Sequence, residues 1–186
     1  MLKVLVTYYS ETKNTEKVAK AIYDEVSKKY QTHLKKLAEI TADALNNYDL
    51  VFLGSACHST DLASPVKKLL ATIPKSPKFK LAGFFTHSAP TKEHSSKSFE
   101  TWASKCVFSF ENTSKEKSID FRGYYNCQGA PSPEIQEFIS NKVFESADSA
   151  LARAAWEQYI EEALKHPNYE DLRKAKEFAQ QVLSNL

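Results

Sequence analysis

The sequence is poor in glycine and carries no large excess of either charge. Only 4 of its 186 residues are glycine, which argues against a β-sandwich that depends on many tight turns. Its 25 basic and 23 acidic residues leave a formal net charge of +2. This balance gives no electrostatic reason to expect nucleic acid or an anionic membrane as a partner. The length predicts a single domain over residues 1–186.

Cysteine, targeting signals and long apolar runs are also scarce. Cys57, Cys106 and Cys127 are spaced too widely for a C-x-x-C or zinc pattern, which predicts reduced thiols in a cytoplasmic protein. The opening MLKVLVTYYS lacks the features of a signal peptide. No apolar run approaches the ~20 residues that span a bilayer, so no membrane association is expected.

Short apolar runs predict the strands of a sheet. Residues 2–9, 49–56 and 81–88 are almost continuously apolar, as is typical of strands buried on both faces. Residues 32–37 and 119–127 are more polar or alternate, which favours sheet edges. Since helical patterns separate these runs, we predict an α/β fold with a doubly wound sheet of five parallel strands in the order 2-1-3-4-5.

Helical periodicity fills the remaining segments. Helices are predicted over residues 15–29, 64–73, 92–106, from Ser132-Pro133 onward, 148–165 and 169–186. A fold of this kind needs one helix after its last strand. Residues 130–167 are therefore predicted to be a helical insertion before the last helix, so that the fold carries extra C-terminal helices.

In such sheets, ligands bind at the carboxyl ends of the strands where the strand order reverses, here between strands one and three. The segments to inspect are 10–15, 55–61 and 86–94. The first places Ser10, Thr12 and Thr15 at the start of a helix, where free N–H groups and the helix dipole attract an anion. Neither a G-K-S/T phosphate loop nor a G-x-G-x-x-G fingerprint is present. A simple Ser/Thr-rich helix cap is the alternative.

The run YYSETKNTE, following the first strand, resembles the T/S-x-T-G-x-T phosphate loop of the flavodoxin family. The resemblance extends through YDLVFLGS to the second loop, and HPNYEDLRKAKEFA is similar to the last helix of some longer flavodoxin-like proteins. It implies that FMN is the cofactor and that its phosphate is bound by the first loop, namely Ser10, Glu11, Thr12, Lys13, Asn14 and Thr15. Lys13 stands where the family usually has glycine, which implies a different loop path or an added cation.

By the same resemblance, two further loops would bind the flavin ring, through Ser55, Ala56, Cys57, His58, Ser59, Thr86, His87, Ser88 and Ala89. His58 is the candidate for stacking or hydrogen bonding where the family often has tryptophan, and an exposed loop histidine is the alternative. Cys57 is either a small apolar filler or a thiol that tunes the flavin. The third loop lacks the family's Gly/Asp-rich character and its tyrosine, which leaves open which aromatic covers the outer face of the flavin. A more exposed flavin would suit a protein that accepts a bulky second substrate.

The first hypothesis for function is an FMN-binding electron-transfer protein, with redox partner proteins or small electron acceptors and no catalytic residue. The first alternative is an FMN-dependent oxidoreductase that reduces quinones or uses a nicotinamide. The second is a flavodoxin-like binding module without flavin. The extra helices could cap the flavin or form a homodimer interface. His58, His87 and His94 match no metal-binding spacing, so no metal is expected.

Overall fold

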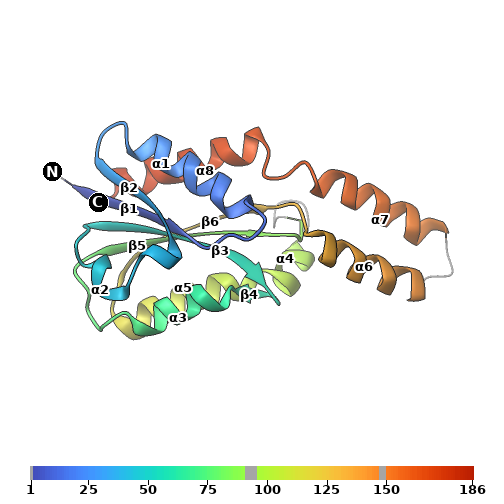
Figure 1. Ribbon diagram of the computed structural model, residues 1–186, viewed down its shortest axis with the longest axis horizontal. Coiled ribbons are helices and arrows are strands. Elements are labelled where there is room, and N and C mark those ends of the chain that lie inside the picture. Colours follow the sequence, from blue (N-terminus) through green and yellow to red (C-terminus); the bar gives the residue numbers. More distant parts are fainter. Residues whose placement is uncertain (1, 91–95, 147–149) are drawn as a thin grey trace.

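The computed structural model describes residues 2–90, 96–146 and 150–186. Its central sheet has five parallel strands in the order β2-β1-β3-β5-β6 (Figure 1). The bounds of these strands are β1 Lys3–Tyr8, β2 Gln31–Lys36, β3 Leu50–His58, β5 Lys80–His87 and β6 Asp120–Gln128. The two-residue β4 (Asp61–Leu62) pairs antiparallel with the end of β3. The predicted doubly wound sheet and its strand order are confirmed.

Strand β3 explains why the sequence of a central strand is apolar throughout. Leu50 and Phe52 face the layer of α1 (Asn14–Val26) and α8 (Tyr169–Ser184). Val51 and Leu53 face the opposite layer, with α3 (Ser64–Thr72) and α5 (Ser104–Lys117). All four side chains are completely buried. Because successive residues of a strand alternate between faces, a strand covered by helices on both sides favours apolar residues at successive positions.

The predicted helix over 92–106 differs in extent from the observed helices. The structure has α4 (Ser96–Trp102) and then α5, with Ala103 between them, while residues 92–95 lie outside the described ranges. Helix α5 continues to Lys117, and buried Cys106, Phe110 and Ser114 lie on one of its faces. The short η1 (Leu37–Glu39) and α2 (Ala42–Leu45) were not predicted.

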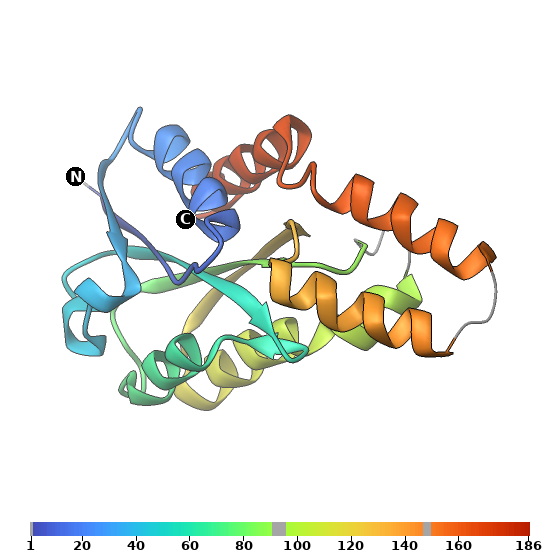
Figure 2. The same cartoon turned by 45° about the vertical axis from the view of Figure 1, so that its right-hand side comes forward.

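Two extra helices, α6 (Pro133–Ser146) and α7 (Ala150–Ala163), fall within the segment predicted as an insertion. They extend past the carboxyl ends of the strands in both views (Figures 1 and 2). At their base, the Ala130 N–H donates to the His166 carbonyl at 2.9 Å. None of the helices in the described ranges is long and apolar enough to span a bilayer.

The carboxyl half of β3 contains a close approach that only glycine permits. A Cβ atom on Gly54 would lie 2.3 Å from two atoms of the Phe84 ring on neighbouring β5. Phe84 is itself completely buried, so its ring has little room to retreat. The absence of a side chain at Gly54 therefore allows the Phe84 ring of β5 to pack directly against the backbone of β3, near the ends from which the loops leave both strands.

We expect the Gly54→Ala substitution to destabilise the protein by about 1–3 kcal/mol, because the added methyl group overpacks the core against Phe84. Urea denaturation measures this change in the free energy of unfolding. Phe84→Leu makes room for the methyl group, so the double variant should be more stable than the sum of the two single effects predicts. Strict additivity would show that Phe84 does not constrain Gly54.

Candidate functional site

The first loop ends at Lys13, which adopts the left-handed conformation with φ 67° and ψ 1° and begins helix α1 as its N-cap. A residue with a side chain thus occupies a backbone region that glycine adopts most readily. The Lys13 side chain is exposed and makes no capping hydrogen bond. The Lys17 N–H donates to the Lys13 carbonyl at 3.0 Å, so the amides of residues 14–16 precede the hydrogen-bonded turns of the helix. Such amides form an anion-binding position.

The side chains of Asn14 and Thr15 hold this loop in place from inside. The hydroxyl oxygens of Thr15 and Thr86 are 2.9 Å apart, and both residues are buried. The Asn14 amide nitrogen donates to the Ala130 carbonyl at 2.8 Å and to the Thr12 hydroxyl at 3.0 Å. Of the predicted hydroxyl groups, those of Ser10 and Thr12 therefore lie on the more open side of the loop, where Ser10 is half-buried and Thr12 exposed.

The second segment, predicted as a loop from Ser55, is instead a strand that continues into a hairpin. β3 runs to His58, and residues 59 and 60 turn with φ of 48° and 75° before β4 returns. Two consecutive positive φ values are typical of a two-residue hairpin turn. The buried Ser55 hydroxyl accepts from the Ala63 N–H at 2.9 Å and donates to the Ala56 carbonyl at 2.8 Å. Ser55 thus supports the base of the hairpin, whereas His58 and Ser59 are exposed near its tip.

Glu11 joins the first and second segments. Its carboxylate lies 3.0 Å from His58 Nε2 and accepts a hydrogen bond from the Tyr9 hydroxyl at 2.6 Å. The Tyr9 and His58 rings meet edge to face, with centroids 6.0 Å apart. Because 57% of the Glu11 side chain and 41% of the His58 side chain are exposed, this contact contributes little to stability. Tyr9 was missed as a site residue; its only sequence signal is that it directly precedes Ser10.

The third segment begins inside the sheet. Thr86 and His87 are buried residues of β5. His87 Nδ1 lies 2.8 Å from the Ala89 carbonyl oxygen, and its Nε2 lies 3.0 Å from Asn126 Oδ1. Burial is the largest influence on the pKa of His87 and lowers it, while these two oxygens act in the opposite direction. His87 is thus a buried part of the sheet edge with both ring nitrogens in contact with protein atoms.

Ser88 connects the third segment to the extra helices. Its carbonyl accepts a hydrogen bond from the Gln128 amide at 3.2 Å and another from the Tyr159 hydroxyl of α7. Trp156 lies against Tyr159, with ring centroids 5.4 Å apart. The sequence did not identify Tyr159 or Gln128 as neighbours of Ser88, because only the fold brings them together.

The predicted site residues therefore gather at one edge, with different roles for their side chains. No group of three or more His, Cys, Asp or Glu residues suited to a metal ion occurs within the described ranges. His94, considered with His58 and His87, lies outside them.

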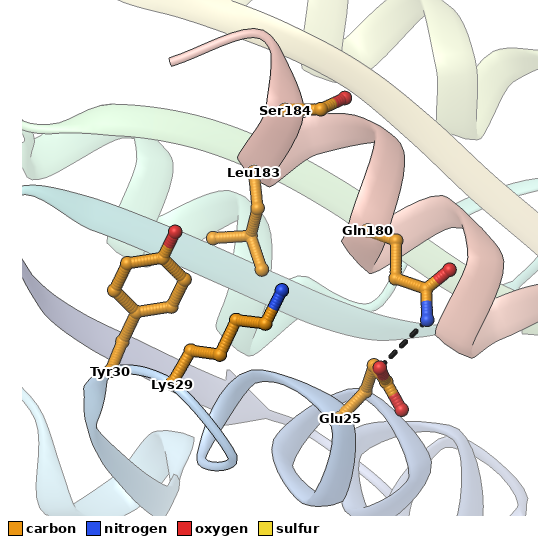
Figure 3. Close-up of a pocket in the computed structure, with 6 residues that line it drawn as sticks. All are labelled: Glu25, Lys29, Tyr30, Gln180, Leu183 and Ser184. Atoms are coloured by element: carbon orange, nitrogen blue, oxygen red, sulfur yellow. Dashed lines mark hydrogen bonds between the residues drawn. The ribbon is translucent and has the colours of Figure 1, made fainter.

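A depression of about 450 Å³ lies at the end of the sheet opposite the candidate site, between the ends of α1 and α8 (Figure 3). Within it, the Gln180 amide donates to Glu25 at 2.7 Å. Tyr30 also lines it and directly precedes β2, which places the depression at the amino ends of the strands. None of the predicted site residues lines it.

We expect Thr15→Val to reduce the free energy of unfolding by about 1–3 kcal/mol, because it leaves the buried Thr86 hydroxyl without this hydrogen-bond partner. Urea denaturation of both single variants and of Thr15→Val with Thr86→Val tests this expectation. The double variant should lose less stability than the two single losses together. Thr113→Val, at a half-buried position of α5, is the control, with a change within about 0.5 kcal/mol. Additive losses at Thr15 and Thr86 would contradict a shared hydrogen bond.

The lowered pKa of His87 predicts a loss of stability in mild acid. Above pH ~6.5 the histidine is neutral in both the folded and the unfolded protein. Below this pH the histidine of the unfolded chain takes up a proton, which the buried ring of the folded protein binds less readily. The free energy of unfolding should therefore fall as the pH is lowered from 7 to 5.5. In His87→Gln this part of the pH dependence should disappear, whereas exposed His33→Gln should retain it. An unchanged pH dependence in His87→Gln would assign the effect to other groups.

Comparison with known proteins agrees with this geometry. The model of the flavodoxin domain matches residues 5–180. The chain is similar to the protein MJ0298 of Methanocaldococcus jannaschii, with 29% identity over 99% of this chain and 100% of that protein. It is also similar to the flavodoxin-like domain-containing protein BilS of Clostridioides difficile, with 26% identity over 98% of this chain and 97% of that protein. Oxidised flavodoxin 1 from Bacillus cereus has the same fold, with a TM-score of 0.63, 14% identity and 99% of each chain covered. The chain belongs to the flavodoxin family.

Proposed function

We propose that this protein binds FMN at the carboxyl edge of its sheet and transfers electrons between redox partner proteins or small electron acceptors. The observation that carries the proposal is the open start of α1, located between β1 and β3 in a chain of the flavodoxin family. A bound FMN would supply the electron-transfer chemistry. The protein's own residues would bind it, orient it and set its surroundings.

The phosphate group would be held chiefly by the first loop. The amides of residues 14–16 and the hydroxyl groups of Ser10 and Thr12 form a set of donors suited to a dianion. Lys13 adds an exposed positive charge beside them. The Glu11 carboxylate opposes an anion, but its contacts with Tyr9 and His58 hold it toward the second segment. This donor set is consistent with the phosphate of FMN.

The flavin ring would contact the tips of the other two segments. Tyr9 and His58 supply aromatic rings, and the exposed turn at Ser59 supplies backbone groups. From the third segment, Ser88 and Ala89 contribute through their backbone. Buried Thr15, Ser55, Thr86 and His87 would act by positioning these elements, because their side chains already bond within the protein.

One observation favours the second candidate, an FMN-dependent oxidoreductase that reduces quinones or uses a nicotinamide. The α6–α7 hairpin lies at the same edge as the proposed flavin site (Figure 2), and Tyr159 joins it to Ser88. A second substrate that approaches this edge would meet the hairpin. Its side chains would then select that substrate.

We expect FMN to bind more tightly than riboflavin, which lacks the phosphate. Because a hydrogen bond to a charged group contributes about 1.5–3 kcal/mol, Ser10→Ala with Thr12→Ala should reduce the preference for FMN by roughly tenfold or more. Quenching of flavin fluorescence during titration measures both affinities. Ser184→Ala, in the depression of Figure 3 at the opposite edge, is the matched control and should leave both affinities unchanged.

Three outcomes separate the hypotheses. An undiminished preference for FMN in the double variant would contradict the phosphate assignment. No binding at micromolar FMN would replace the proposal with the flavin-free binding module. Rapid oxidation of a nicotinamide by the FMN-loaded protein, with a quinone as acceptor, would favour the oxidoreductase over the electron carrier.

A further inference from the structure

Two of the three cysteines lie on elements that face each other. Cys57 is near the end of β3, next to the hairpin turn, and is half-buried. Cys106 is in the first turn of α5 and is completely buried. The two residues are far apart in the sequence, and neither takes part in the contacts described above for the proposed FMN site.

Contacts on either side of Cys106 bring α5 against the hairpin that carries Cys57. Trp102 is the last residue of α4, and Cys106 and Ser109 lie in the first half of α5. Before Cys106 in the chain, the Trp102 carbonyl accepts a hydrogen bond from the Cys57 thiol at 3.4 Å. After Cys106, the Ser109 hydroxyl donates to Asp61 Oδ1 at 2.6 Å. Asp61 pairs with His58, the neighbour of Cys57. Cys106 therefore lies between two contacts to the same hairpin.

The neighbouring Cys57 thiol also influences the acidity of Cys106. A hydrogen bond with the Cys57 thiol is the largest influence on the pKa of Cys106 and raises it, and burial raises it further. Cys106 thus keeps its proton. Cys57 is partly exposed to solvent, so it is the thiol that can react with a reagent in solution. Cys127 belongs to the opposite core layer, with α1 and α8, and has no part in this arrangement.

We propose that Cys57 and Cys106 form a reversible disulfide when the protein meets a small disulfide oxidant such as glutathione disulfide. The Cys57 thiolate attacks one sulfur of glutathione disulfide, and glutathione leaves with the proton that Cys57 lost. The Cys106 sulfur then attacks the Cys57 sulfur of the mixed disulfide, and the second glutathione leaves with the proton of Cys106. Two thiols are oxidised, and one glutathione disulfide is reduced to two molecules of glutathione.

The resulting bond would attach the end of β3 covalently to α5. His58 and Ser59 at the hairpin tip follow Cys57 directly, so oxidation would restrict the segment proposed to contact the flavin ring. The disulfide itself requires no flavin. Its test is therefore independent of the proposed function.

The experiment treats the full chain with glutathione disulfide, traps free thiols with iodoacetamide and measures the mass of the intact protein and of its tryptic peptides. We expect the protein to lose the mass of two hydrogen atoms. Peptides 37–67 and 106–115, which carry Cys57 and Cys106, should be joined. Dithiothreitol should restore the original mass. A stable glutathione adduct on Cys57 in the wild-type protein, no reaction, or a joined peptide that carries Cys127 would each overturn the proposal.

Variants test the order of the two steps. Cys106→Ser removes the second thiol, so the reaction should stop at a glutathione adduct on Cys57. Cys57→Ser should prevent both the adduct and the disulfide, because buried Cys106 is not the attacking thiol. Cys127→Ser, at an equally buried cysteine of the other layer, is the matched control and should still form the disulfide. A thermal unfolding transition confirms that each variant is folded. The wild-type experiment tests the proposal even without the variants.

Discussion

The burial of a parallel sheet on both faces is the constraint on which the rest of this structure depends. Strands β1, β3 and β5 have helices above and below, so each connection must cross over to a helix before the next strand begins. The three segments that leave these strands therefore emerge at one edge. The position of the candidate site follows from this topology, before any polar side chain is considered.

At that edge, buried polar side chains position the chain and exposed groups are left for binding. Thr15 bonds to Thr86, Asn14 bonds to Ala130, and Ser55 closes the base of the hairpin. The first two of these bonds join segments that are distant in the sequence, and the third joins Ser55 to Ala63 within one hairpin. The backbone amides at the start of α1, by contrast, have no role in the helix itself. A rigid edge with open backbone donors is the arrangement that binding an anion requires.

The sequence was sufficient for the strands and their order, because a strand buried on both faces leaves a continuous apolar run, as in residues 50–53. It also placed the start of each of the three segments at the carboxyl ends of β1, β3 and β5. It could not show which way side chains turn: Ser10 and Thr15 are both hydroxyl residues of one loop, yet Thr15 is directed inward by Thr86, a residue 71 positions away. The sequence also did not show that β3 extends to His58, because this extension depends on pairing with only two residues of β4.

The charge balance and the extra helices together bear on how a partner of the proposed electron carrier would be recognised. A net charge of +2 provides no strongly acidic field to steer a basic partner toward the edge. The α6–α7 hairpin does lie there. Leu151, near the start of α7, and Leu164, directly after its end, leave 82% and 51% of their surfaces exposed. Recognition at this edge would then rest on the shape and apolar surface of the hairpin, which acts at short range and depends little on salt.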